Sequence, residues 1–196
     1  KEKKDLYIEG VQNNGIINHY EYIINSEGTI EIRHVLKPEG KMPLWFPRIG
    51  LTLTVSDALD QVKWYGRGPQ ENYPDRKTGY PTGIYASTVQ AMYEPYLMPQ
   101  DYGLRTDVRW LQLTTDKGIG LQFKMNEWFN FNIYPYSTDN LTKAMYTYQL
   151  QKQKGMTLNL DYATTGVGCT ARGVFGAYKA MPQEYRRTIS IKPMMK

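Results

Sequence analysis

Apolar and polar residues alternate with a period of two along most of this 196-residue chain. The clearest case is the run from Leu51 to Val55, where Leu51, Leu53 and Val55 fall on one face and two threonines fall on the other. Because successive side chains of a strand point to opposite faces, this pattern predicts half-buried β-strands. Further runs predicted as strands are 20–24, 29–36, 62–64, 110–114, 120–125, 129–133, 158–161 and 188–191.

Two short turn signals join neighbouring strands of this pattern. Asn25–Gly28 connects the strands predicted at 20–24 and 29–36, and it ends on a glycine that can adopt a positive φ. Asp116–Gly118 is a second signal of the same kind. Both predict β-hairpins, so the paired strands are expected to be antiparallel.

One segment departs from the period of two. After Ser137, a predicted N-cap, Leu141, Ala144 and Met145 fall at helical spacing and predict a short helix that closes one end of the sheets. The predicted fold class is therefore all-β, an antiparallel β-sandwich with at most one or two short helices. The length suits a single domain spanning residues 1–196.

Composition and charge distribution argue against two classes of function, nucleic-acid binding and membrane spanning. Apolar residues make up 41% of the chain, enough for a core, and the net charge of +5 is spread along the sequence. No dense block of Lys and Arg interleaves with aromatic residues, so no nucleic-acid partner is expected. No run of about 18 apolar residues occurs, so no membrane span is expected. The chain begins at Lys1 without a methionine, and we expect it to be a piece of a longer protein.

Cysteine and histidine are scarce. The single cysteine, Cys169, excludes an internal disulfide and a cysteine-based metal site. His19 and His34 are too few, and too close in sequence, to predict a metal site. We interpret His34, beside Arg33 in a predicted strand, as a partly buried structural residue rather than a catalytic base. No metal or cofactor is therefore expected in these residues.

The segment from Trp64 to Lys77 has neither a helical nor an alternating pattern. Gly66 and Gly68 permit backbone angles that are closed to other residues, whereas Pro69 and Pro74 fix φ and remove hydrogen-bond donors. A segment built in this way is predicted to be an ordered loop of fixed shape rather than a slack linker.

The same segment carries a family resemblance. Its sequence GRGPQENYPDRKTG resembles the G.GP.ENYPDR signature of the C-terminal small-chain domain of family 2 β-galactosidases of the large bacterial type. Segments that agree in order are Lys37–Pro43 followed by Pro47–Leu51, Tyr96–Leu111, Phe129–Ser137, Leu158–Tyr162 and Gly166–Gly168. The resemblance covers essentially the whole chain.

The resemblance implies a galactose-mutarotase-like supersandwich fold. It also implies a parent enzyme that hydrolyses terminal β-D-galactosides with retention, through two glutamates of a separate barrel domain. Acidic residues in predicted loops are Glu71, Asp75, Asp101 and Asp107, and the sequence singles out no pair among them. We therefore assign no catalytic residue to this chain. It is expected to be a scaffold and an edge of the substrate pocket, inactive in isolation.

The implied partners belong to the parent protein. They are a galactoside or glycan substrate, the barrel domain of the same polypeptide, and further copies in a homo-oligomer. Mg²⁺ or Na⁺ is implied for the parent and not for this chain. The resemblance leaves open whether the compartment is the bacterial cytoplasm or periplasm.

Two interpretations of the signature segment remain. Its residues are Gly68, Pro69, Glu71, Asn72, Tyr73, Asp75 and Arg76. In the first interpretation its carboxylates and arginine pair with one another and hold the shape of the loop, and in the second they contact sugar hydroxyls. The first is favoured because charged groups in ordered loops usually satisfy their neighbours.

The segment Gly166–Gly173 is the predicted contribution to the substrate pocket. In several members of the resembled family the corresponding loop offers a tryptophan to the sugar, whereas this sequence has Arg172 and Gly173 near that place. We predict that Cys169, Thr170, Arg172 and Gly173 contact substrate. The alternative is a glycine-rich turn without ligand contact.

Two other functions remain open at this point. An independent carbohydrate-binding module needs an aromatic cluster on a concave sheet face. A mutarotase-like epimerase needs a histidine and a carboxylate that converge in that concavity. Neither His19 nor His34 matches the histidine of such a pair by motif.

Overall fold

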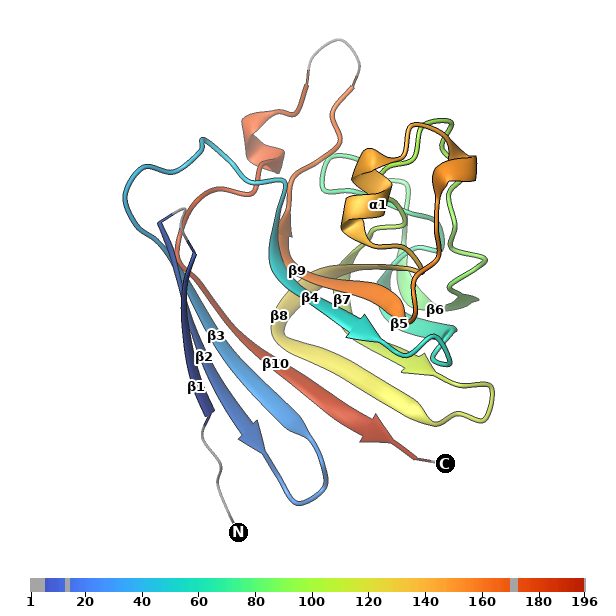
Figure 1. The fold of residues 1–196 in the computed structure, drawn as a ribbon, viewed down its shortest axis with the longest axis horizontal. Coiled ribbons are helices and arrows are strands. Elements are labelled where there is room, and N and C mark those ends of the chain that lie inside the picture. Colours follow the sequence, from blue (N-terminus) through green and yellow to red (C-terminus); the bar gives the residue numbers. More distant parts are fainter. Residues whose placement is uncertain (1–5, 13–14, 170–172, 196) are drawn as a thin grey trace.

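The computed structural model describes residues 6–12, 15–169 and 173–195 (Figure 1). Described elements are β1 (Leu6–Gln12), β2 (Ile16–Ile24), β3 (Ile30–Pro38), β4 (Arg48–Val55), β5 (Gln61–Arg67), β6 (Thr82–Thr88), β7 (Arg105–Thr114), β8 (Gly120–Tyr134), α1 (Thr138–Lys143), η1 (Thr147–Gln149), β9 (Met156–Thr164), η2 (Gly176–Tyr178) and β10 (Tyr185–Met194). Among these elements, no helix is long and apolar enough to cross a membrane. The all-β prediction is confirmed.

Every strand pairing in the described residues is antiparallel, and β8 connects the two layers. The main sheet has the order β1-β2-β3-β10-β8-β7-β5-β6, and β9 pairs with both β8 and β4 outside that order. The first part of β8 pairs with β10, and its last part, Asn130–Tyr134, pairs with β9. In Figure 1, β9 and β4 consequently lie in front of the main sheet. The strands predicted at 120–125 and 129–133 are one strand.

The two layers share one hydrophobic core. Trp64 and Leu111 from the main sheet, Phe123 and Phe131 from β8, and Leu160 from β9 are each at most 1% exposed. Burial of apolar surface on this scale is the main favourable contribution to folding. The period of two in the sequence therefore reports a core between layers.

The short helix begins and ends near its predicted position. The hydroxyl of Ser137 accepts a hydrogen bond from the backbone N–H of Asn140 at 3.1 Å, as an N-cap does. Leu141 and Ala144 are buried as the spacing predicts. Met145 is 55% exposed instead, because the helix ends at Lys143 and the chain turns outward.

Both predicted hairpins are present, and both rely on a left-handed glycine. Gly28 and Gly118 each have φ 78°, a conformation that costs glycine little. The hairpin between β7 and β8 aligns Leu113 with Leu121. This register keeps the apolar face of both strands toward the core.

His34 lies in the core, where it joins β3 to β2 and β9. Its Nδ1 is 2.7 Å from the hydroxyl of Tyr162, its Nε2 is 2.9 Å from Oδ1 of Asn18, and its ring stacks on Tyr20. Because an amide oxygen can only accept, Nε2 carries the proton and Nδ1 accepts from the tyrosine. Burial lowers the pKa of His34 to about 4. The imidazole is therefore neutral and structural.

Acidification is expected to destabilise the fold through His34. The folded-state pKa lies below the unfolded value of 6.5, so the unfolded chain binds the proton first as pH falls. The free energy of unfolding should decrease from about pH 6.5 to pH 4, by on the order of 3 kcal/mol. Urea unfolding between about pH 6.5 and pH 4 measures this decrease in the free energy of unfolding, and the variant His34→Gln serves as the comparison. A variant with the same pH dependence as the wild type would contradict the assignment.

Candidate functional site

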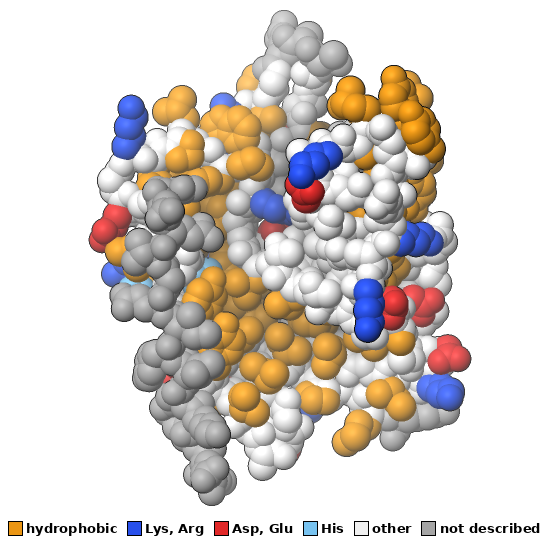
Figure 2. Space-filling model, in the orientation of Figure 1, with side chains coloured by type: hydrophobic (Ala, Val, Ile, Leu, Met, Phe, Trp, Pro, Cys, Tyr) orange, Lys and Arg blue, Asp and Glu red, His pale blue; other side chains and the backbone are white. Residues whose placement is uncertain are grey.

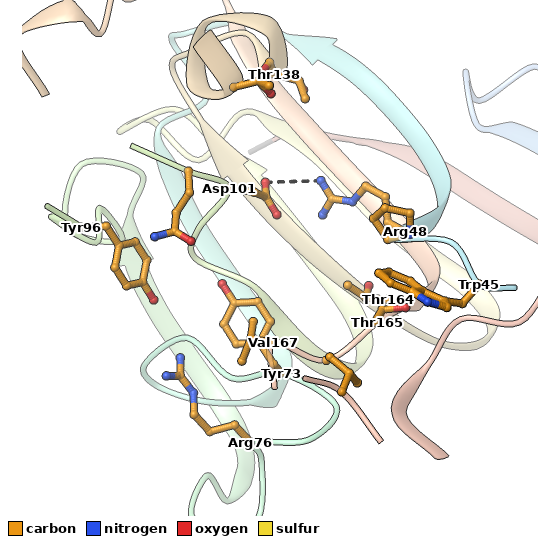
Figure 3. A pocket seen from close by; sticks show the side chains of 15 residues that line it. Trp45, Arg48, Tyr73, Arg76, Tyr96, Asp101, Thr138, Thr164, Thr165 and Val167 are labelled. Carbon is orange, nitrogen blue, oxygen red and sulfur yellow. Dashed lines mark hydrogen bonds and ion pairs between the residues drawn. The ribbon is translucent and has the colours of Figure 1, made fainter. Parts of the chain in front are cut away.

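An open cleft of about 830 Å³ lies beside α1 and the first residues of β4 (Figure 3). Its lining includes three aromatic side chains, Trp45, Tyr73 and Tyr96, and the side chains of Arg48, Arg76 and Asp101. Threonines 138 and 142 of α1, Gly166 and Val167 also line it. In Figure 3, Tyr96 and Trp45 stand on opposite sides of the cleft. The cleft thus combines flat apolar faces with charged groups, which suits a polar ligand with apolar ring faces.

A buried carboxylate holds the signature loop, residues 68–76. Glu71 accepts hydrogen bonds from Arg76 at 2.7 Å, from the Tyr73 hydroxyl at 3.1 Å and from the Gly103 N–H at 2.9 Å. The hydroxyl of Tyr96 is a further donor. Burial acts to raise the pKa of Glu71, but the donors outweigh it and the pKa lies below its usual value. Glu71 is therefore an ionised acceptor that its own neighbours satisfy.

Asn72 fastens the same loop to β7. Its backbone N–H donates to the carbonyl of Leu104 at 2.8 Å, and its side-chain oxygen accepts from the N–H of Thr106 at 3.1 Å. Its amide nitrogen donates to the carbonyl of Gln70 at 3.0 Å. Asn72 is fully buried. The contacts of Glu71 and Asn72 agree with the structural interpretation of this loop.

Asp75 contacts the second predicted segment instead of pairing with Arg76. Its two carboxylate oxygens accept from the backbone N–H groups of Val167 at 3.1 Å and Gly168 at 2.7 Å. A Cβ atom at Gly166 would lie 2.3 Å from the Asp75 carboxyl carbon, so a larger residue would displace this contact. The signature loop therefore holds the base of the segment predicted to reach the substrate.

The predicted substrate-binding residues are only partly described. Thr170 and Arg172 lie outside the described residues. Cys169 is exposed, and its carbonyl accepts from the N–H of Gly173 at 3.2 Å. Val167, before this pair, and Val174, after it, line the cleft. Substrate contact by these four residues stays a prediction.

The floor of the cleft is an ion-pair network. Arg48 donates to Asp161 at 2.8 Å and lies 3.4 Å from Asp101, the contact drawn in Figure 3. Asn132 donates to Asp101 at 2.9 Å. Burial raises the pKa of Asp161 to about 6, although the charge of Arg48 opposes the shift. In the described part of the chain, Asp101 is the one acidic residue that lines the cleft.

The sequence did not single out Trp45 or Arg48 as site residues. Trp45 is 38% exposed, and Lys179 lies 5.5 Å from its ring centroid. Both residues lie next to or within the Pro47–Leu51 motif, which was interpreted only as a family signature. The sequence could not place these two residues in the cleft, because only the fold brings the start of β4 opposite Tyr96.

Among the described residues, no three His, Cys, Asp or Glu side chains come together in an arrangement that could hold a metal ion. Mg²⁺ and Na⁺ were implied for the parent alone, and metal use by the parent stays a prediction.

Comparison with known proteins identifies the family. The family model described as "Beta galactosidase small chain" matches residues 4–191. The chain belongs to the β-galactosidase small-chain family. A β-galactosidase of Priestia megaterium is 38% identical over 147 residues, which are 75% of this chain and 14% of that protein. A β-galactosidase of Vibrio cholerae is 39% identical over 122 residues, 62% of this chain and 11% of that protein.

The chain therefore spans only 14% and 11% of the lengths of these two curated relatives. Among solved structures, a putative aldose 1-epimerase of Escherichia coli aligns with a TM-score of 0.41 at 6% identity. That alignment covers 97% of this chain and 69% of the epimerase.

Removing the Glu71 carboxylate should destabilise the fold more than removing the guanidinium of Arg76, with which it pairs. Glu71→Ala leaves the buried donors Gly103 and Tyr73 unpaired, so we expect a loss of about 3–5 kcal/mol. Arg76 is half exposed, so Arg76→Ala should cost only about 1 kcal/mol. Chemical denaturation of both variants measures the difference. Equal losses would mean that Glu71 is not the anchor of the loop.

Asp75→Ala should loosen the segment that borders the cleft. Without the carboxylate, the amides of Val167 and Gly168 lose their acceptor, and stability should fall by about 1–3 kcal/mol. Hydrogen exchange of these two amides should accelerate. The control is Asp139→Ala, which removes an exposed helix pair with Lys143 and should change stability by less than about 0.5 kcal/mol. Unchanged exchange at Val167 and Gly168 would refute the contact.

Proposed function

We propose that this chain is the C-terminal part of a β-galactosidase that hydrolyses terminal β-D-galactosides with retention. The observation that carries the proposal is the family match across residues 4–191, together with relatives named β-galactosidase. The catalytic glutamates belong to a barrel domain outside these 196 residues. This chain acts as a scaffold and forms one edge of the substrate pocket.

The contacts of the carboxylates support a structural role for this chain rather than a catalytic one. Retaining hydrolysis by the usual route needs two carboxyl groups roughly 5–5.5 Å apart, one of which donates a proton. Glu71 is ionised and saturated with donors, and Asp161 is buried against Arg48. Asp101, at the cleft, is held by Arg48 and Asn132. These acids stabilise structure, so the proposal places the chemistry elsewhere.

The cleft supports a role in positioning. Trp45 and Tyr96 present aromatic faces, and the half-exposed guanidinium of Arg76 presents donors toward a sugar. Gly166 and Val167, at the start of the segment Gly166–Gly173, line the same cleft, and contact of the segment's polar groups with the galactoside is part of the proposal. Holding a substrate in one orientation lowers the entropic cost of the reaction. The proposed protein partners are the barrel domain and further copies of the parent in a homo-oligomer. Any Mg²⁺ or Na⁺ is proposed to bind the parent outside this chain.

A carbohydrate-binding module is the second candidate, and the aromatic lining of the cleft favours it. In that case Trp45 and Tyr96 would bind sugar without the rest of the polypeptide. The epimerase alternative gains no such support. Both ring nitrogens of His34 contact Tyr162 and Asn18, and neither partner is a carboxylate.

The isolated chain should not hydrolyse a chromogenic β-galactoside, whereas the full-length polypeptide from the same gene should. In the full-length protein, the turnover of Asp101→Asn should stay within about tenfold of the wild-type value, because Asp101 transfers no proton in this proposal. Galactose titrated into the isolated chain tests the binding module in parallel. Turnover by residues 1–196 that is lost in Asp101→Asn would overturn the proposal, and sugar binding that is lost in Trp45→Ala would favour the module.

A further inference from the structure

A second pocket, of about 380 Å³, neighbours the cleft and borders the same signature loop. Tyr73 and Arg76 of that loop line the cleft, whereas Pro74 and the following Lys77 line the second pocket. The two pockets share one lining residue, Thr164. A volume of this size lies in the range, roughly 300–1,000 Å³, of pockets that hold small molecules.

The second pocket opens where β8 passes from one layer to the other. β8 pairs with β10 as far as Met125 and with β9 from Asn130 onward. Between these two residues, β8 has no register partner in either strand. Trp128 of β8 and Arg187 of β10 line the resulting gap. The pocket is therefore a consequence of the strand crossing that builds the fold.

Cationic groups outnumber acidic groups at this pocket. Lys77, Lys179 and Arg187 line it, and Asp107 is the one acidic residue among its described lining residues. Burial acts to raise the pKa of Asp107, but hydrogen bonds from Lys77 at 2.8 Å and Arg67 at 2.6 Å outweigh it, and the pKa lies below its usual value. By contrast, hydrophobic side chains gather over the centre of the face drawn in Figure 2. The excess of positive charge favours an anionic ligand.

Arg187 brings donors to the pocket that the fold does not fully use. Its guanidinium carbon lies 5.7 Å from the ring centroid of Tyr162 and 5.9 Å from that of Tyr185. Its Nη2 pairs at 2.9 Å with Glu127, whose side chain is 58% exposed, so this pair is weak. Its Nε is buried and has no hydrogen-bond partner among the described residues. Because buried donors are usually satisfied, this incomplete set of partners points to a ligand rather than to a purely structural role.

Trp128 supplies an aromatic surface that is held in place. Its side chain is 60% exposed. The guanidinium carbon of Arg109 lies 4.1 Å from its ring centroid, and Nη1 of Arg109 donates to the backbone carbonyl of Asp107 at 2.6 Å. A ring that is already positioned loses little conformational entropy when a ligand stacks on it. Trp128 therefore provides a platform for the apolar face of a ring-shaped ligand.

The backbone at Asp107 connects the platform to the cationic groups. Asp107 has φ 55°, the one positive φ among the described residues other than glycine. It lies where the register between β7 and β8 shifts, between Arg105 and Val108. Such irregularities re-aim side chains and are frequent at ligand sites, where the strain is retained for function. Here the carboxylate faces Lys77 and the carbonyl accepts from Arg109.

We propose that this pocket is a second saccharide site, selective for a sugar that carries a carboxylate. The sugar ring stacks on Trp128, and its carboxylate accepts hydrogen bonds from Arg187 and Lys77. Asp107 positions Lys77 and does not contact the ligand. A neutral sugar binds here more weakly, because it offers the cations no charged acceptor. The inference goes beyond the proposed hydrolysis, since neither Trp128, Arg187 nor Lys77 lines the cleft.

Calorimetric titration of the full-length polypeptide with galacturonate tests the proposal. Galacturonate differs from galactose by a carboxylate at carbon 6, and saturating galactose is present throughout so that a neutral sugar occupies the cleft. Galacturonate should bind saturably, with a dissociation constant of roughly 1–10 mM. The absence of saturable binding up to about 10 mM overturns the proposal.

Two neighbouring arginines provide a matched pair of variants. Arg187→Gln should weaken galacturonate binding at least about tenfold, because a charge-assisted hydrogen bond is lost. Arg186 lies on the opposite face of β10 with its side chain 66% exposed, and Arg186→Gln should change the affinity by less than about twofold. Thermal unfolding checks that both variants fold. Equal effects of the two substitutions contradict the proposal.

A second pair of variants tests the aromatic platform, and it keeps the proposal testable if Arg187→Gln does not fold. Trp128→Ala should weaken galacturonate binding about fivefold. The control is Tyr148→Ala, which removes a 79% exposed ring that lines neither pocket and should have less than about a twofold effect. Unchanged binding in Trp128→Ala contradicts the platform.

Acetate separates a saccharide site from a simple anion site. It carries the carboxylate but no ring, so it should compete with galacturonate at least about tenfold more weakly. Equal competition by acetate would make the pocket a general anion site and overturn the proposal.

Discussion

The buried carboxylate of Glu71 is the interaction on which the geometry of the candidate site depends. Two of its four donors, Tyr73 and Arg76, belong to the signature loop itself. The other two are the hydroxyl of Tyr96 and the backbone N–H of Gly103, shortly before β7. A buried ionised group is tolerated only when donors surround it, so the contact specifies where each of these segments lies. Because Tyr96 also lines the cleft, the same carboxylate positions one of the aromatic walls.

The positioning continues outward through Asp75. The loop that Glu71 holds presents Asp75 to the N–H groups of Val167 and Gly168, so the base of the Gly166–Gly173 segment is placed by a residue about ninety positions earlier. On the opposite side, the ion pair of Arg48 and Asp161 fixes the floor. The carboxylates of Glu71, Asp75 and Asp161 therefore hold the segments that form the cleft. That use of acids agrees with a pocket edge whose chemistry is supplied by another part of the protein.

Local sequence patterns predicted the strands and the short helix, but they could not predict contacts between residues far apart in the sequence. Alternation at Leu51–Val55 and the Ser137 cap each act within a few residues, so the sequence alone revealed them. The continuity of β8 was missed because residues 126–128 break the apolar alternation, while ladder pairing keeps the strand extended. The partner of Asp75 could not be predicted, since loops contain many possible donors and only the fold selects one. Trp45 was missed for the same reason.

A structure of the full-length polypeptide with a bound galactoside tests the central claim most directly. The account predicts that the sugar lies against the Gly166–Gly173 segment and the cleft. It also predicts that the carboxylates within hydrogen-bond reach of the glycosidic oxygen, roughly 2.6–3.2 Å, come from outside residues 1–196. A sugar whose glycosidic oxygen contacts Asp101 or Glu71 would contradict the account, as would a sugar bound far from this edge.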